Sequence, residues 1–168
     1  MKIASFNING IKARLSSLKE WLEKEKPDII GLQELKSDND TLYKNMFSDL
    51  GYDFIFNGQK SYNGCGILSN QEITNISYFF PGNENDKQSR WLSAEINGIL
   101  FCNLYLPNGN PIGTEKFDYK IEWMNLLYNY TKSLITLGQP VILMGDFNVI
   151  PQDIDCKSPK KWESDALF

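Results

Sequence analysis

The order of strand-like and helix-like segments constrains the fold of this chain more than any other feature of its sequence. The first 50 residues alternate between the two kinds of segment, and Pro27 ends the first helical stretch. Asp38 or Asp40 is positioned to cap the second helix. The predicted elements are, in order, a strand at 3–8, a helix at 11–26, a strand at 28–32 and a helix at 41–50.

The middle of the chain changes character and contains only short β-prone runs separated by turn signals. Asn97-Gly98 predicts a tight hairpin between the last two of these runs. The five runs are 52–56, 64–69, 73–79, 90–96 and 100–106.

A long amphipathic helix is predicted from Thr114 to about Leu134, and a final strand follows at 141–144. The side chains that we expect to face inward from this helix are Phe117, Ile121, Met124, Leu127 and Leu134. The whole order predicts an α+β fold in which helices pack on mixed sheet, as a single domain over residues 1–168.

Composition limits the function. The chain has no apolar run of membrane-spanning length and no secretory leader pattern, so we expect a cytoplasmic protein that does not bind membranes. Its three cysteines have no spacing typical of disulfides or zinc sites. It has no histidine, which excludes imidazole as a base or ligand from this chain acting alone. A net charge of −4 argues against a general polycation but leaves local nucleic-acid contacts open.

Polar side chains recur where the predicted strands end. If these strands lie side by side, their ends converge on one rim, where Glu34 could bind a hard cation and Asp146 could orient water. Each residue also has a purely structural interpretation, as a solvated strand end or an Asx-type turn. The recurring residues are Asn7, Asn9, Gln33, Glu34, Tyr105, Asn108, Asp146 and Asn148.

Several motifs, in order along the chain, resemble the exonuclease III family of abasic-site endonucleases, which belongs to the endonuclease/exonuclease/phosphatase group. They cover essentially the whole chain. The matching segments are Phe6-Asn7-Ile8-Asn9-Gly10-Ile11-Lys12-Ala13-Arg14, Leu32-Gln33-Glu34, Tyr62-Asn63-Gly64, Asn103-Leu104-Tyr105-Leu106-Pro107-Asn108-Gly109, Gly145-Asp146-Phe147-Asn148-Val149-Ile150-Pro151 and Trp162-Glu163-Ser164-Asp165-Ala166-Leu167-Phe168.

This resemblance implies a Mg²⁺-dependent nuclease, with Mn²⁺ as the alternative metal, acting in base excision repair. Such an enzyme cuts double-stranded DNA 5′ to an abasic site and trims 3′ ends. By matched motif, Glu34 and Asn7 would form the metal site, and Tyr105 and Asp146 would be catalytic.

The resemblance also implies substrate contacts. Asn148 would take part in catalysis and hold the phosphate together with Asn7. Arg90, Lys116 and Lys120 would contact the DNA backbone, unless the lysines are simply solvated charges.

Members of this family are longer, so the resemblance implies the N-terminal part of a four-layer αββα sandwich, an incomplete domain whose activity is impaired by the missing C-terminal part. We expect such a chain to be poorly soluble, marginally folded or dependent on a complementing C-terminal chain. Two alternatives remain open for the function. One is a phosphoesterase of the same superfamily that acts on a small or lipid-linked phosphate ester. The other is a non-catalytic half that binds DNA or a complementing chain.

Overall fold

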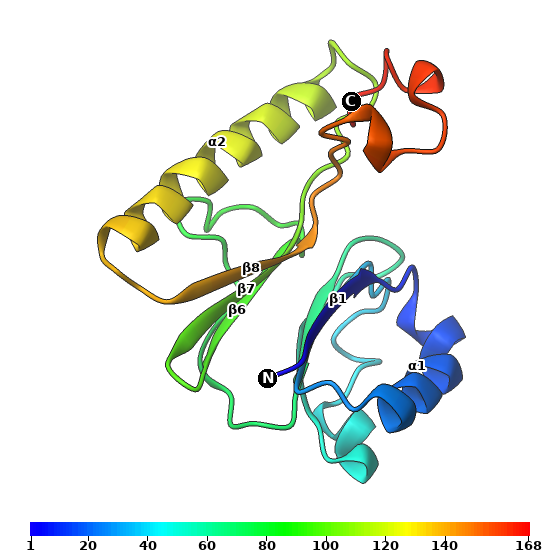
Figure 1. Cartoon of the computed structure of the whole chain (residues 1–168), viewed down its shortest axis with the longest axis vertical. Helices are drawn as coiled ribbons and strands as arrows, with labels where there is room; N and C mark the ends of the chain where they lie inside the picture. Colours follow the sequence, from blue (N-terminus) through cyan, green and yellow to red (C-terminus); the bar gives the residue numbers. More distant parts are fainter.

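Two four-stranded sheets face each other between two helices in the computed structural model, which describes residues 1–168 (Figure 1). Three short 3₁₀ segments complete the chain. The helices and strands are β1 (Ile3–Asn7), α1 (Ile11–Glu25), β2 (Ile29–Gln33), η1 (Lys44–Leu50), β3 (Asp53–Asn57), β4 (Cys65–Ser69), β5 (Thr74–Ser77), β6 (Trp91–Ile96), β7 (Ile99–Tyr105), α2 (Glu115–Thr136), β8 (Val141–Asp146), η2 (Asp153–Asp155) and η3 (Pro159–Lys161).

Each sheet combines one parallel pair with antiparallel neighbours. The first has the order β1-β2-β4-β3, and the second has the order β5-β6-β7-β8. The parallel pairs are β1 with β2 and β7 with β8. A helix connects the two strands of each pair, as parallel pairing requires: α1 lies between β1 and β2, and α2 lies between β7 and β8.

Three apolar clusters separate the four layers. The first packs α1 and η1 against one sheet and includes Leu18, Leu22 and Phe47. The second lies between the two sheets. The third packs α2 against the outer face of the second sheet through Trp123 and Leu127. Helix on sheet on sheet on helix is the αββα arrangement that the resemblance implies, and the α+β fold predicted from the order of elements is confirmed.

A buried amide joins the two sheets. Asn103 on β7 donates from Nδ2 to the carbonyl oxygens of Leu32 (2.9 Å) and Gly66 (2.8 Å) in the first sheet. Its Oδ1 accepts from Gln33 Nε2 at 2.6 Å. A Cβ added at Gly31 would lie 3.0 Å from Asn103 Oδ1, so the second sheet leaves no room for a side chain at this position of β2.

The predicted hairpin is confirmed. Asn97 and Gly98 connect β6 to β7, and both have positive φ angles, 52° and 74°. That pair of left-handed residues is the conformation of a tight two-residue turn, which Asn-Gly favours.

The predicted helix over 41–50 is wrong in type and extent. The chain forms a 3₁₀ segment at Lys44–Leu50, and Phe47 within it has non-helical angles (φ −125°, ψ 15°). Consecutive Met46 and Phe47 are both buried, which an α-helix on a flat surface cannot arrange as easily as a kinked turn.

The predicted inward face of α2 is only half correct. Leu127 and Leu134 are buried, but Ile121 and Met124 are 42% and 36% exposed. The buried stripe instead begins with Lys120 and Trp123. The predicted stripe and the buried stripe both have helical spacing. The stripe that contains Trp123 faces the sheet because its indole packs against Phe80, with 4.5 Å between the ring centroids.

Two strands have an unpaired edge on the same side of the sandwich. β1 pairs only with β2, and β8 pairs only with β7. β1 leaves Ile3 (38%) and Phe6 (37%) exposed, whereas its neighbour β2 is buried throughout. No helix of the structure is both long and apolar enough to span a membrane.

We predict that Asn103→Ala destabilises the protein strongly, because two buried carbonyls and the Gln33 amide lose their partner. The expected decrease in unfolding free energy is about 3 kcal/mol, measured by urea denaturation. Asn125→Ala, an exposed change on α2, serves as the control and should shift it by less than about 0.5 kcal/mol. Equal effects of the two changes would show that the inter-sheet amide is unimportant.

Candidate active site at the strand ends

The polar residues singled out in the sequence meet at the ends of four strands. Asn7 and Gln33 are the last register pair of β1 and β2. Tyr105 and Asp146 are the last register pair of β7 and β8. Because the strands of each pair run parallel, their carboxyl ends meet at one rim. The expectation that these strand ends converge is therefore confirmed.

The Glu34 carboxylate lies at the centre of this rim. Its Oε1 accepts from Asn7 Nδ2 at 2.8 Å and from the Tyr105 hydroxyl at 2.7 Å. Its Oε2 pairs with Lys36 Nζ at 2.7 Å. Glu34 has a positive φ of 54°, a conformation that non-glycine residues seldom adopt and that is concentrated at functional sites. Residues from both sheets thus hold one carboxylate.

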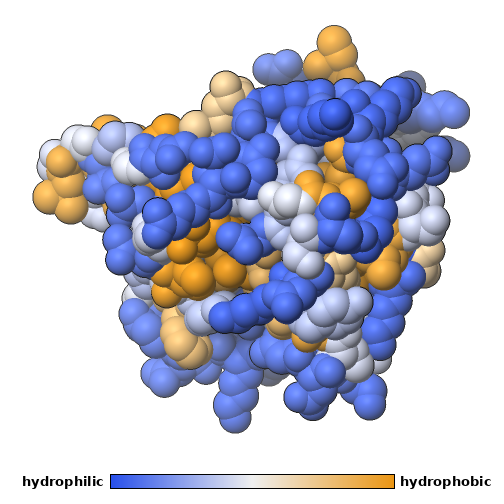
Figure 2. Space-filling view, turned by 90° about the horizontal axis from the view of Figure 1, so that it is seen from below, coloured by the Kyte–Doolittle hydropathy of each residue, from blue (hydrophilic) through white to orange (hydrophobic).

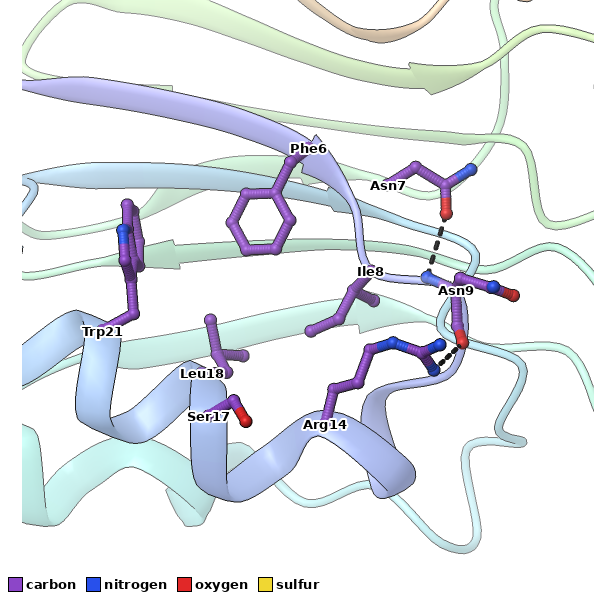
Figure 3. Close-up of a pocket in the computed structure, with 8 residues that line it drawn as sticks. All are labelled: Phe6, Asn7, Ile8, Asn9, Arg14, Ser17, Leu18 and Trp21. Carbon is purple, nitrogen blue, oxygen red and sulfur yellow. Dashed lines mark hydrogen bonds between the residues drawn. The ribbon is translucent and has the colours of Figure 1, made fainter.

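Asn7 connects the two carboxylates of the rim. Its Nδ2 donates both to Glu34 and, at 2.9 Å, to Asp146 Oδ2. Its Oδ1 accepts from the backbone amide of Asn9 at 2.9 Å (Figure 3). In this arrangement Asn7 orients Glu34 and Asp146 as a donor, and its oxygen faces the backbone.

Asn148 is fixed beside Asp146 by the loop that follows β8. Its backbone amide donates to Asp146 Oδ1 at 3.0 Å, and its Nδ2 donates to the carbonyl of Leu106 at 2.8 Å. The Asx-type turn expected here is present, and it links the carboxylate and the amide of the Gly-Asp-Phe-Asn motif.

Burial and hydrogen bonding oppose each other at Glu34. Burial raises its pKa, but hydrogen bonds from Lys36, Asn7 and Tyr105 together outweigh burial, so the pKa is lowered from its ordinary value of 4.5. Burial raises the pKa of Tyr105, and the adjacent Glu34 carboxylate raises it further. At neutral pH the pair is therefore an ionised Glu34 that accepts from a protonated Tyr105.

Arg90 packs behind Tyr105. Its guanidinium lies 4.9 Å from the centre of the Tyr105 ring, and it donates to the Tyr105 carbonyl at 3.1 Å. Its Nε donates to Gln88 at 2.8 Å. Arg90 thus belongs to the structure around the rim and holds the tyrosine in place from one side.

The two lysines of α2 have different environments. Lys116 is exposed in the first turn and makes no hydrogen bond or ion pair with the rim residues. Lys120 is only 2% exposed, so both sequence interpretations of it, as a DNA contact and as a solvated charge, are wrong. Lys120 lies on the buried stripe of the helix, one residue before Ile121 of the predicted stripe.

Sequence reasoning missed Lys36. Its ammonium pairs with Glu34 and also donates to Asn9 Oδ1 at 2.6 Å, which ties the loops after β1 and β2 together. A lysine in a polar segment gives no sign of such a role. Its position two residues after Glu34 was the only available signal.

The donor set fits a hard divalent cation. Mg²⁺ commonly takes one or two carboxylates from the protein and keeps several waters. Glu34 supplies one carboxylate for a cation, and Asn7 links it to a second carboxylate, Asp146, that can orient a water. The chain has no group of three histidine, cysteine or acidic side chains that could form an all-protein cage. The rim therefore suits a magnesium-type site and not a zinc-type one.

A groove extends from the rim along the open side of β1. Figure 3 shows Phe6 on β1 facing Leu18 and Trp21 of α1 across this groove, and Arg14 at its end near Asn9. The rings of Phe6 and Trp21 meet edge to face with centroids 5.6 Å apart. An apolar groove thus adjoins the polar rim at Asn7.

Comparison with known proteins gives a consistent result. The profile of the Endonuclease/Exonuclease/phosphatase family matches residues 4–166. Exodeoxyribonuclease III of Haemophilus influenzae is 35% identical over 96% of this chain and 64% of its own length. A DNA-(apurinic or apyrimidinic site) endonuclease of Dictyostelium discoideum is 32% identical over all of this chain and 47% of its own length.

Solved structures agree in fold. An AP endonuclease from Archaeoglobus fulgidus superposes with a TM-score of 0.93 at 36% identity, over all of this chain and 65% of that protein. A 3′ phosphatase from Neisseria, bound to a product DNA hairpin, gives 0.89 at 33% identity, over 97% of this chain and 63% of that protein.

The chain belongs to the Endonuclease/Exonuclease/phosphatase family, as the fold and the profile match together show. It resembles the exodeoxyribonuclease III and AP endonuclease members, which confirms the resemblance seen in the motifs. It spans between about half and two thirds of the length of these relatives.

We predict that the Glu34 interactions make stability depend on pH in the acid range. A carboxyl group whose pKa is lower in the folded state stabilises the protein above its unfolded pKa, and this stabilisation is lost as pH falls through the folded pKa. Wild type should therefore melt at a higher temperature than Glu34→Gln at pH 7, and the difference should vanish as pH falls below 4.5 toward the lowered pKa.

Thermal melts of both proteins from pH 7 to pH 3 test this. Glu122→Gln, an exposed change on α2, controls for general effects of charge and should follow wild type throughout. The prediction would be contradicted if the difference in melting temperature between wild type and Glu34→Gln were the same at pH 3 as at pH 7.

Proposed function

We propose that this chain carries the N-terminal catalytic half of a Mg²⁺-dependent DNA phosphodiesterase of the exonuclease III type, with Mn²⁺ as an alternative metal. In this proposal it acts in base excision repair, cutting 5′ to abasic sites and trimming 3′ ends. One observation carries the proposal: Asn7, Glu34, Tyr105 and Asp146, from the ends of four strands in two sheets, form one continuous hydrogen-bonded group.

The metal would be held by Glu34 with Asn7 beside it. When bound, Mg²⁺ polarises a phosphoryl oxygen and stabilises the charge that develops during hydrolysis. Glu34 is ionised, and Asn7 and Tyr105 fix its Oε1; a cation bound at Oε2 would take the place of the Lys36 ammonium.

The remaining residues would handle the water and the phosphate. Asp146, oriented by Asn7 and Asn148, would take a proton from the attacking water as the new P–O bond forms. The leaving 3′ oxygen would take up a proton from solvent as its bond to phosphorus breaks, and Asp146 would release its proton to solvent. Tyr105 would contact the phosphate, and Asn148 would donate to one of its oxygens.

DNA is the proposed substrate because the similar proteins are named for acting on it and one was solved with a DNA hairpin. Lys116, exposed on α2, is the proposed contact to the DNA backbone. Arg90 could reach a phosphate only with the part of its guanidinium that Gln88 and Tyr105 leave free. A cytoplasmic location stays a prediction.

We predict that the purified chain nicks a duplex with an abasic-site analogue when Mg²⁺ is added. Glu34→Ala and Asp146→Asn should each lower the rate by about 100-fold or more, because the first removes the carboxylate proposed to hold the metal and the second replaces the proposed base with an amide that cannot take up a proton. Glu122→Gln should retain the wild-type rate. The measurement is the initial rate on a labelled duplex separated on a denaturing gel.

A sugar-phosphate ester assayed in parallel separates the DNA function from the phosphoesterase alternative. Faster hydrolysis of the ester than of the duplex would favour that alternative. Mg²⁺-independent binding of the duplex without nicking would favour a non-catalytic half.

We further propose that residues 1–168 form an incomplete domain, completed by strands of a complementing polypeptide at the open edges of β1 and β8. Both edges have unpaired backbone groups, which favour the addition of a strand. The groove between β1 and α1 is lined by Phe6, Leu18 and Trp21 (Figure 3). Figure 2 shows apolar surface gathered between hydrophilic residues on one face of the molecule. The greater length of the relatives supports this partner.

We predict that the chain alone binds a hydrophobic dye and self-associates as its concentration rises, because unpaired apolar edges associate. Ile3→Lys at the β1 edge should reduce self-association, and Ile112→Lys, exposed in a loop, should not. Adding a polypeptide with the C-terminal third of the Archaeoglobus fulgidus AP endonuclease should give a 1:1 complex and abolish dye binding. Sedimentation velocity measures self-association and the 1:1 complex, and the fluorescence of the dye measures dye binding. A soluble monomer with a sharp melt and no dye binding would refute the proposal.

A further inference from the structure

A fully buried lysine lies beneath the proposed active site. Lys120, on the inner stripe of α2, is 2% exposed. Its ammonium donates to three backbone carbonyls: Ala166 at 2.6 Å, Asn148 at 2.7 Å and Asn108 at 3.3 Å. An ammonium has three N–H donors, so all of them are used.

No carboxylate pairs with this charge. The four ion pairs of the structure involve other cations, namely the N-terminus, Lys2, Lys19 and Lys36. Burial lowers the pKa of Lys120, and the charge of Asp165 opposes that effect. The ammonium is thus compensated mainly by carbonyl dipoles. A buried charge is costly, and one that serves only packing could be replaced by an apolar side chain.

The surroundings are shaped for the lysine stem. A Cβ at Gly109 would lie 2.6 Å from Lys120 Cδ, and Gly109 has a φ of +83°. Both the close approach and the left-handed conformation require glycine at this position. The loop after β7 therefore packs directly against the lysine stem at Gly109.

The three carbonyls belong to three separate segments. Asn108 is in the loop after β7, Asn148 is in the loop after β8, and Ala166 is near the end of the chain. Other bonds join the same segments: the Ile150 amide donates to Leu167 at 2.5 Å, and the Ala166 amide donates to Asn110 Oδ1 at 3.0 Å. Lys120 is the one side chain that bonds to all three.

We infer that Lys120 is a positioning residue that fixes Asn148 in the site by binding its carbonyl. Asn148 is then held at three atoms: its carbonyl by Lys120, its backbone amide by Asp146 and its Nδ2 by Leu106. These contacts set the direction of the side-chain amide beside Asp146.

This inference rests on the proposed function only for what Asn148 does to a phosphate; the anchoring itself does not depend on it. We therefore test anchoring first, by hydrogen–deuterium exchange of the chain as it is. Lys120→Met keeps the unbranched stem and removes the charge and the donors. Amide exchange in residues 147–151 and 164–168 should become about tenfold faster or more, with β6 and β7 unchanged. Lys132→Met, exposed on the same helix, is the control and should exchange like wild type.

A second readout separates positioning from general stability. The side-chain amide signal of Asn148 in a ¹⁵N spectrum should shift in Lys120→Met, and Lys120→Arg, which keeps the charge, should restore it in part. The signals of Asn97 and Asn125, far from the loop, should stay in place. If Lys120→Met lacks a cooperative melt, Lys120→Gln is measured in its place, since it retains an amide donor. Unchanged exchange and an unchanged Asn148 signal would overturn the inference.

Affinity for a 3′-phosphorylated duplex, measured in EDTA, links the anchoring to the proposed function. Lys120→Met and Asn148→Ala should each weaken binding several-fold, and the double variant should be no weaker than Asn148→Ala, because the lysine acts through Asn148. Additive losses would overturn positioning through Asn148. Absence of duplex binding by wild type would count against the proposed function, while exchange and the Asn148 signal would still decide the anchoring.

Discussion

The contact between the two sheets through Asn103 is the interaction on which the rest of the structure depends. A sandwich held only by apolar side chains could slide, because apolar contacts have little direction. The Asn103 amide bonds to carbonyls of β2 and β4 and to Gln33, so it fixes the position of one sheet on the other. Gln33 is immediately before Glu34, and Tyr105 is two residues after Asn103. The same contact therefore places Glu34 within reach of Tyr105.

The proposed site lies next to the Asn103 contact, at the rim where strands of both sheets end. Two βαβ units, one in each sheet, end on the same rim, and each contributes part of the hydrogen-bonded group. Glu34 and Asn7 come from the first sheet, and Tyr105 and Asp146 come from the second. The site is thus an inter-sheet feature, and its geometry depends on how firmly the sheets and the loops after β7 and β8 are held. Lys120 helps to hold the loops after β7 and β8, because its ammonium bonds to both loops and to Ala166.

Some features could be predicted from sequence because their causes are local. Asn97-Gly98 determines its own turn, and the apolar runs before Gln33 and Asp146 make strands whose ends carry polar groups. The helix at 41–50 could not be settled in this way, since its kink at Phe47 comes from packing two adjacent residues into the first core. The inner face of α2 was also undetermined, because two stripes of similar period compete and the aromatic cluster around Trp123 selects one.

The sequence by itself determined the order of strands and helices, the hairpin at Asn97-Gly98, the family motifs and the polar residues at the strand ends. Each of these follows from neighbours along the chain. Only the tertiary structure decided that Asn7 donates to two carboxylates, that Lys36 pairs with Glu34 and that Lys120 is a buried anchor and not a surface cation. These contacts depend on which segments, distant in sequence, pack against each other. The type and spacing of a single lysine or asparagine do not predict such packing.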